Sequence, residues 1–201
     1  MSMTASLIDP GHPRRTAAPA RTEPLALVPP LRLVSQPEGL LQIHTAPFRG
    51  SFAAVFSQAL RSAGLGSRVL VSQFLKGGVE QGPAGSLTLC GRLEWLRPGT
   101  PHCLDGPPGS QGEEGATAEE ALEAVAEVWE VSRERLLKGD LDLLVLDELG
   151  LAIALGYLSA EAVIEALEQR PAHLDVILTG PSMPASLMAM ADQVTQLRRG
   201  G

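Results

Sequence analysis

The stretch from Leu40 to Leu75 constrains the fold of this chain more than any other part of its sequence. Residues 40–45 form a short apolar segment that leads into a turn with proline and glycine, and residues 69–75 form a second apolar segment typical of a buried strand. Between them, apolar residues recur at helical spacing from Ser51 until Gly66. A strand, a helix and a strand within about thirty residues form a βαβ unit, which requires a parallel sheet.

The alternation of strands and helices continues along the chain. The sequence predicts a short strand at 93–96, a helix from Thr117 to Lys138 that begins with a capping box, and a strongly apolar strand at 141–146. The later predicted elements are a helix at 159–169, a strand at 175–179, a short helix at 185–190 and a strand at 193–197. This order predicts an α/β fold with a doubly wound, mainly parallel sheet.

The beginning of the chain differs from the rest in composition. It is rich in proline, alanine and threonine, and its frequent prolines would interrupt any helix or strand before a core formed. We therefore predict a disordered tail over residues 1–36 and a single domain over residues 37–201.

Charge and cysteine content limit the classes of partner. The net charge of −7 gives no basic excess for nucleic acid, and no apolar run approaches the length of a membrane span. Cys90 and Cys103 lack the spacing of a metal site, so we expect reduced thiols. These features predict a cytoplasmic protein that binds neither nucleic acid nor a membrane.

The turn at residues 45–52 stands where a phosphate loop would lie. Such a loop, G-x-x-x-x-G-K-[ST], holds phosphate with backbone N–H groups and a lysine, while its hydroxyl residue binds Mg²⁺. Of that pattern this turn keeps Gly50. The first glycine, the lysine and the hydroxyl residue are replaced by Ala46, Ser51 and Phe52.

Two other residues of the turn affect its capacity to bind an anion. Pro47 removes one N–H donor, whereas Arg49 offers several donors close to the N-terminus of the following helix. From the residues alone, the turn is either a plain connection that binds nothing or an anion site.

Asp147 and Glu148 follow the most apolar predicted strand. Open α/β sheets bind ligands at the carboxyl ends of their strands, and carboxylate oxygens suit Mg²⁺. The pair either orients a metal or only caps the strand. Further candidates at this edge are Gln73, Lys76, Thr179 and Gly180. Among them, Lys76 could replace the missing loop lysine.

Six short motifs follow the order found in one enzyme family. They are residues 59–64, 73–77, 146–149, 169–171, 179–180 and 191–198. In these motifs the chain resembles the ATP:co(I)rrinoid adenosyltransferases of cobalamin synthesis and salvage, from about Leu41 to Arg198.

This resemblance implies a RecA-like P-loop NTPase sheet, usually in a homodimer. ATP would lie in the loop, and Co(I) of a bound corrinoid would attack its adenosyl carbon. The implied nucleotide-binding residues are Thr45, Ala46, Phe48, Arg49, Gly50, Ser51, Phe52, Arg61, Gln73, Lys76, Thr179 and Gly180. Asp147 and Glu148 would lie near Mg²⁺ and are the candidate catalytic residues.

The departures from the family pattern fall where the chemistry takes place. Ser51 and Phe52 replace its lysine and threonine, and Pro181 replaces an arginine. Loss of a preorganised cation beside a leaving phosphate removes several kcal/mol of transition-state stabilisation, on the order of a thousandfold in rate. The chain resembles a branch, associated with cyanobacteria, that keeps the scaffold with an altered loop. We expect weak binding of ATP and Mg²⁺ and weakened or lost catalysis.

Two other functions stay open at this point. The domain could be a non-catalytic, nucleotide-binding regulatory module or a scaffold that engages a protein partner. Alternatively, Arg49 and Lys76 take over the lost contacts and activity is complete. We also expect Phe52 to be buried and to fill part of the phosphate space, because a large apolar side chain near the core gains from burial.

Overall fold

The computed structural model describes residues 38–50, 52–78, 81–110 and 116–198. The predicted tail, residues 1–36, lies outside the described residues, and so does Ser51. The boundary between tail and domain therefore stays a prediction.

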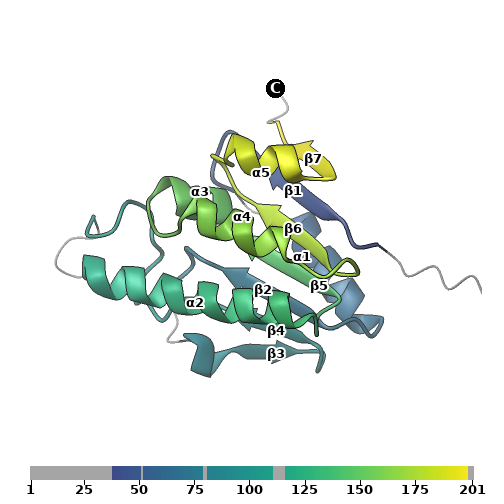
Figure 1. Ribbon diagram of the computed structural model, residues 1–201. Helices are drawn as coiled ribbons and strands as arrows, with labels where there is room; N and C mark the ends of the chain where they lie inside the picture. The colour runs from purple at the N-terminus through teal and green to yellow at the C-terminus, as the bar shows by residue number, and fades with distance from the viewer. Residues whose placement is uncertain (1–37, 51, 79–80, 111–115, 199–201) are drawn as a thin grey trace, which may run out of the picture. The chain divides into compact units, whose positions relative to one another are not determined.

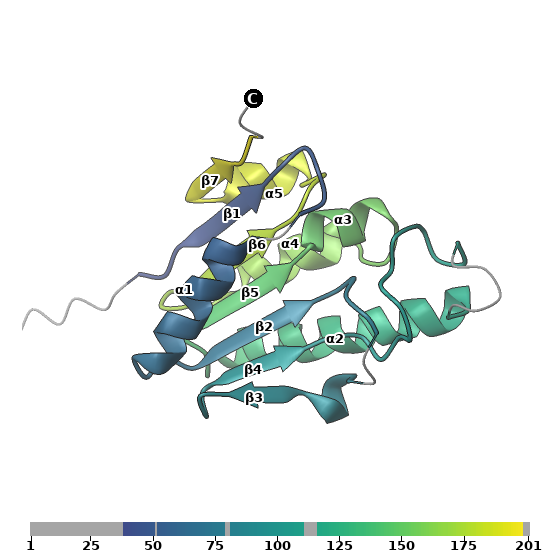
Figure 2. The same ribbon diagram turned by 180° about the vertical axis from the view of Figure 1, so that it is seen from behind.

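Within the described residues, seven strands form one sheet in the order β3-β4-β2-β5-β6-β1-β7 (Figures 1 and 2). Their bounds are β1 Leu41–Thr45, β2 Val69–Gln73, β3 Leu87–Leu89, β4 Leu93–Leu96, β5 Leu143–Asp147, β6 Asp175–Thr179 and β7 Gln193–Gln196. Neighbouring strands are parallel except β3 and β4, which are antiparallel. The predicted α/β class with a mainly parallel sheet is confirmed.

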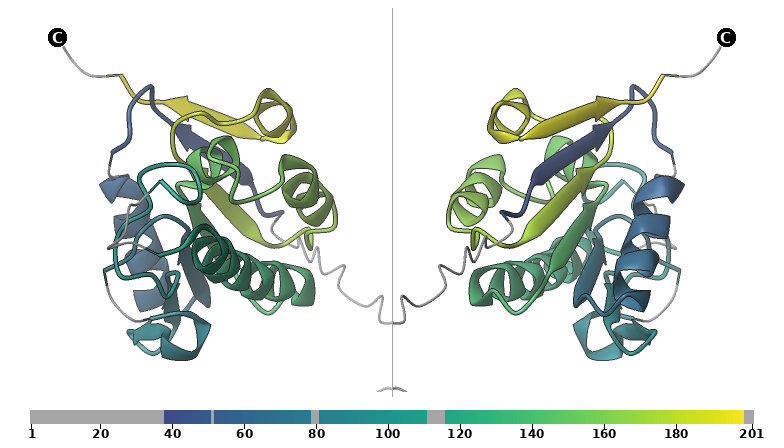
Figure 3. Two further views of the ribbon diagram at one scale, coloured as in Figure 1. Left: turned by 90° about the vertical axis from the view of Figure 1, so that its left-hand side faces the viewer. Right: turned by 90° about the vertical axis from the view of Figure 1, so that its right-hand side faces the viewer.

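Helices cover both faces of the sheet (Figure 3). They are α1 Ala53–Gly64, α2 Ala118–Lys138, α3 Leu149–Ala154, α4 Ala160–Glu168 and α5 Ala185–Met190, with a 3-10 turn η1 at Pro83–Gly85. Helix α1 packs on one face, and α2 to α5 pack on the other. None of the helices in the described part of the chain is long and apolar enough to cross a membrane.

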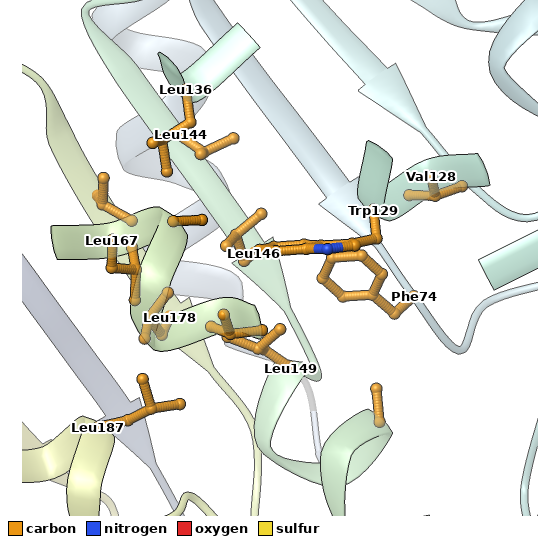
Figure 4. Close-up of a cluster of buried hydrophobic side chains, with 14 of the residues drawn as sticks. Phe74, Val128, Trp129, Leu136, Leu144, Leu146, Leu149, Leu167, Leu178 and Leu187 are labelled. Carbon is orange, nitrogen blue, oxygen red and sulfur yellow. The ribbon is translucent and has the colours of Figure 1, made fainter. Parts of the chain in front are cut away.

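The core consists of two clusters separated by the sheet. In β5, Leu143 and Val145 face the α1 side, whereas Leu144 and Leu146 face α2, because successive side chains of a strand point to opposite faces. A strand buried on both faces reads as a continuous apolar run, which explains the sequence of β5. Figure 4 shows the α2-side cluster, where the Phe74 and Trp129 rings lie 6.5 Å apart.

The largest differences between predicted and observed strand ends occur in two strands. The predicted strands at 69–75 and 141–146 are longer at one end than β2 and β5, which span Val69–Gln73 and Leu143–Asp147. The extra apolar residues Phe74, Leu75 and Leu141 are fully buried although they lie outside the ladder. Buried apolar residues in the connections next to a strand therefore lengthen the apolar run, so that the sequence predicts too long a strand.

The structure also contains elements that the sequence did not predict. Strand β3 is only three residues long, its first two residues are exposed, and it lies at an edge of the sheet. Helix α3 is six residues long and directly follows the acidic pair. Elements this short do not reveal a period.

The capping box at the start of α2 gives a first testable prediction. Oγ1 of Thr117 accepts a hydrogen bond from the Glu120 amide (3.2 Å), and the Glu120 carboxylate accepts one from the Thr117 amide (2.9 Å). Thr117→Ala is therefore expected to lower the free energy of unfolding by about 1 kcal/mol in urea titrations. Thr117→Ser, which keeps the hydroxyl, should retain most of that stability. Equal stability of the alanine variant and the wild type would contradict the cap.

Candidate functional site

The carboxyl ends of four parallel strands meet along one edge of the sheet (Figure 2). Strands β1, β2, β5 and β6 end there with Thr45, Gln73, Asp147 and Thr179. All four residues are buried, so polar groups from distant parts of the sequence meet in a region of low solvent access. Such an arrangement is typical of ligand sites in open α/β sheets.

Asp147 is held by hydrogen bonds from both neighbouring strands. Its Oδ1 accepts a bond from Oγ1 of Thr179 (2.6 Å), and its Oδ2 accepts one from Nε2 of Gln73 (2.7 Å). Only 3% of Asp147 is exposed. Burial raises the pKa of its carboxyl above the ordinary value, and the two hydrogen bonds oppose that rise.

Gln73 extends this network from β2 to the neighbouring strand β4. Its Oε1 accepts hydrogen bonds from Nε1 of Trp95 and Nε of Arg97, both at 2.8 Å. The Trp95 ring stacks on Phe56 of α1, with 5.4 Å between ring centroids. The side-chain amide of Gln73 is therefore fixed in orientation, and the network ends in an aromatic pair.

Glu148 begins α3 in a left-handed conformation, with φ of 60°. Its amide donates to Oγ1 of Thr179 (3.1 Å). Gly180 allows the backbone to approach this closely, because a Cβ there would lie 3.0 Å from the Cα of Glu148. The carboxylate, in a residue only 1% exposed, is thus placed beside Asp147 at the strand ends.

Arg49 reaches from the turn to the Glu148 carboxylate. Its Nε lies 2.6 Å from Oε1 and its Nη2 lies 3.1 Å from Oε2, which is a bidentate ion pair. The hydrogen bond with Glu148 raises the pKa of Arg49. Its Nη1 binds Asp105, and Nζ of Lys76 lies 3.6 Å from Oε2 of Glu148. Two carboxylates therefore bind one guanidinium at the mouth of the site, and a second cation lies beside one of them.

An open cleft of about 580 Å³ lies beside these groups. It is lined by Arg49, Gly50, Phe56, Gln73, Lys76, Cys103, Asp105 and Asp147. Its volume is in the range of small-molecule sites.

The cleft wall that carries Cys103 and Asp105 is anchored to the body of the domain. Leu104, between them, is fully buried, and its amide donates to the carbonyl of Leu75 (3.0 Å). The hydroxyl of Tyr157 donates to the carbonyl of Gly106 (3.0 Å).

The structure brings together most of the predicted site residues. Arg49, Gly50, Gln73, Lys76 and Asp147 line the cleft, and Glu148, Thr179 and Gly180 lie directly behind it. Thr45 lies beside them, with its Oγ1 donating to the carbonyl of Gly180 (2.8 Å).

Other predicted residues lie elsewhere. Phe52 is buried as expected, but it belongs to the α1-side cluster and the aromatic side chain that lines the cleft is Phe56. Ala46 is buried in the same cluster, and Phe48 packs against it. Ser51 lies outside the described residues. Ala46 and Thr45 line a separate hollow of about 340 Å³, with Met183, Met188 and Leu197 among its walls.

Arg61 is not among the residues that line the cleft, and its assignment to nucleotide binding stays a prediction. It lies exposed in the last turn of α1, whereas the first turn of that helix follows the phosphate-loop turn. The helical rise places it roughly 12 Å along the axis from Ala53, so the chain itself does not bring it into the cleft.

Sequence reasoning missed Asp105, Phe56, Cys103 and Arg97 as parts of the site. In the sequence, Phe56 is one of the apolar residues at helical spacing between Ser51 and Gly66, a pattern that indicates only a buried face. Asp105 lies in a long stretch rich in glycine and proline, which indicates a loop but not what the loop contacts.

The acidic pair does not fit the predicted Mg²⁺ site. Each of the four carboxylate oxygens of Asp147 and Glu148 accepts a hydrogen bond from a protein group. Within the ranges that the structure describes, no three His, Cys, Asp or Glu residues gather into a metal-binding group. Mg²⁺ would have to displace Arg49 before it could bind Glu148.

Comparison with known proteins agrees with the motif order. The model of one family, described as ATP:corrinoid adenosyltransferase BtuR/CobO/CobP, matches residues 37–200. The chain is 34% identical over 160 residues to the corrinoid adenosyltransferase of Escherichia coli K12, covering 80% of this chain and 76% of that protein. Corrinoid adenosyltransferase CobA of Salmonella typhimurium is similar to the same extent. An uncharacterized protein of Nostoc sp. is 30% identical over 171 residues, covering 80% of this chain and 44% of that protein.

Proposed function

The chain belongs to the ATP:corrinoid adenosyltransferase family, and we propose that it represents a branch in which adenosyl transfer from ATP to a Co(I) corrinoid is weakened or lost. The observation that carries this proposal is the burial of Phe52. It stands at the position of the hydroxyl residue in a phosphate loop, yet it is only 3% exposed and packs with Ala46 and Val55 in the core. The side chain at that position therefore offers no ligand to a phosphate or its counter-ion.

The rest of the turn supports the same conclusion. Ser51 replaces the loop lysine, and Pro47 supplies no N–H donor. The two nearby cations that could take over, Arg49 and Lys76, both face Glu148. This arrangement argues against complete activity through substituted contacts.

The chemistry of the reaction explains why these losses matter. Co(I) supplies the electron pair of the new cobalt–carbon bond, and the carbon–oxygen bond breaks with its pair going to the triphosphate. The leaving group thus gains negative charge in the transition state, and preorganised donors lower the barrier at that point. A loop without its lysine and hydroxyl provides less of this stabilisation.

A side-by-side assay with the Escherichia coli relative tests the proposal. Both proteins would be given ATP, Mg²⁺ and the same Co(I) corrinoid, and formation of the adenosylated product would be followed by absorbance. The rate for this chain is expected to be lower by on the order of a thousandfold. Rates within tenfold of each other would refute weakened catalysis.

Variants at position 51 provide the matched control. Ser51→Lys returns a cation to the loop and is expected to raise the adenosylation rate, whereas Ser51→Met has similar length without charge and should not. If neither ATP binding nor product formation is detected in any variant, the non-catalytic module that engages a protein partner becomes the better hypothesis. A homodimer, a cytoplasmic location and the absence of nucleic-acid and membrane partners stay predictions.

A further inference from the structure

The guanidinium of Arg49 is engaged at each of its three nitrogens by groups of its own chain. Nε and Nη2 bind Glu148, Nη1 binds Asp105, and Nη2 also lies 3.4 Å from the carbonyl oxygen of Leu75. The side chain is 27% exposed, so this ion pair is partly shielded from water. An incoming phosphate would meet a cation most of whose donors are already in use.

The acidic pair is equally occupied. Asp147 accepts hydrogen bonds at both oxygens, and Glu148 accepts two bonds from Arg49, with Lys76 close to one of them. Mg²⁺ requires near-octahedral oxygen ligands at about 2.0–2.1 Å, and the bidentate pair engages both oxygens of the Glu148 carboxylate, so the ion would have to compete with Arg49 for them. The negative charge of Glu148, which a metal ion would neutralise, is neutralised by Arg49.

We propose that Arg49 takes the place of a divalent cation, so that the cleft binds the nucleoside part of its ligand without Mg²⁺ and without gaining affinity from phosphates. The ligand class, a nucleoside with an unphosphorylated 5′ end, rests on the proposed function, because a family that transfers adenosyl groups supplies the nucleoside.

The charges around the cleft support this ligand class. Arg49 binds Asp105 and Glu148, and Lys76 lies near Glu148. With Arg97 and Asp147 included, the site has three cations and three carboxylates, so these groups together carry no positive excess. A triphosphate brings several negative charges into this field and has to separate existing ion pairs to bind. A neutral nucleoside avoids both costs.

The shape of the cleft also suits a nucleoside. Its volume of about 580 Å³ exceeds that of a single nucleobase, and Phe56, fixed by stacking on Trp95, supplies an aromatic wall. Stacking of a base on an aromatic side chain stabilises binding whether or not the ligand carries phosphate. The affinity would thus come from the base.

Titration calorimetry with the full chain tests the ligand class. The probes are adenosine, AMP and ATP, each measured with excess Mg²⁺ and with EDTA. Adenosine is expected to bind at least as tightly as ATP, and Mg²⁺ should change the affinity for adenosine less than twofold. Tenfold tighter binding of ATP with Mg²⁺ would overturn the proposal, as would no binding of adenosine.

Substitution of Glu148 tests how its negative charge affects ligand affinity without a change in side-chain size. Glu148→Gln keeps the side-chain volume but removes the negative charge that holds Arg49 and Lys76. We expect ATP to bind at least tenfold more tightly to this variant, while adenosine affinity changes less than twofold. Unchanged ATP affinity in a folded variant would overturn the proposal.

Binding of Mn²⁺, measured as a loss of the electron paramagnetic resonance signal of the free ion, tests whether Arg49 occupies the position of a divalent cation. The wild type should leave Mn²⁺ free, whereas Arg49→Met should bind it. Arg133→Met removes an exposed arginine that is paired with Glu130 at 3.5 Å, and it should behave like the wild type. Mn²⁺ binding by the wild type, or none by Arg49→Met, would overturn the assignment. These outcomes do not depend on the adenosylation rate, so a fast rate would refute the proposed function alone.

Discussion

Arg49→Ala is expected to lower the free energy of unfolding by about 3 kcal/mol. Removal of the guanidinium leaves the Glu148 carboxylate buried, with Lys76 at 3.6 Å as its nearest remaining cation. Loss of one partner of a buried ion pair typically costs about 3–5 kcal/mol, because the other charge stays without compensation. Lys76 and the partial exposure of Arg49 place the expected value at the lower end. Urea unfolding followed by circular dichroism would measure it.

Two controls identify the source of that loss. The double variant Arg49→Ala with Glu148→Gln removes the stranded charge and should recover more than half of the stability. Asp105→Ala removes the other carboxylate that Arg49 binds, but this side chain is 77% exposed, so the change should be below about 1 kcal/mol. Equal effects of Arg49→Ala and Asp105→Ala would contradict the role assigned to the buried pair.

Gly77→Ala is the second substitution with a large expected effect. A Cβ at this position would overlap the carbonyl oxygen of His102 and Oγ1 of Thr100, and it would lie 2.6 Å from the carbonyl carbon of His102. The two atoms of His102 belong to the backbone, so they cannot move aside as the end of a flexible side chain could. We expect a loss of about 3 kcal/mol, the upper end of the range for overpacking.

The same variant should disturb the cleft. The segment that carries Asp105 is joined to this turn by a hydrogen bond from the Gly78 amide to the carbonyl of Thr100 (3.0 Å). Gly64→Ala is the matched control, because Gly64 ends α1 with no atom within 4 Å of an added Cβ. It should be neutral or more stable by up to about 1 kcal/mol. Similar losses in both variants would show that the overlap at Gly77 is unimportant.

The fold could be predicted largely because its signals are local. Helix α2 begins at Ala118 after its capping box, and β6 has the bounds Asp175–Thr179 that its apolar run predicts. Where the prediction differs, as at Phe74 and Leu141, the residues are buried for tertiary reasons that a short sequence window does not contain.

The site could be predicted only in part. Gln73, Asp147 and Thr179 follow from one rule, because the carboxyl ends of parallel strands meet at one edge. The contact between Arg49 and Asp105 follows from no such rule, since it joins two loops that are 56 residues apart. The sequence showed that the loop lysine is missing, but only the structure showed which carboxylates the remaining arginine binds.

The network around Gln73 gives the protein a built-in optical reporter. The chain has two tryptophans, which lie on opposite faces of the sheet. The Trp95 indole is hydrogen-bonded to Gln73 and stacked on Phe56, a residue of the cleft wall, whereas Trp129 is packed against Phe74 in the α2-side cluster. Fluorescence from Trp95 thus senses the polarity of the cleft, and fluorescence from Trp129 senses the integrity of the core. Substitution of either tryptophan by phenylalanine leaves one fluorophore, so that ligand binding and unfolding can be followed separately by fluorescence.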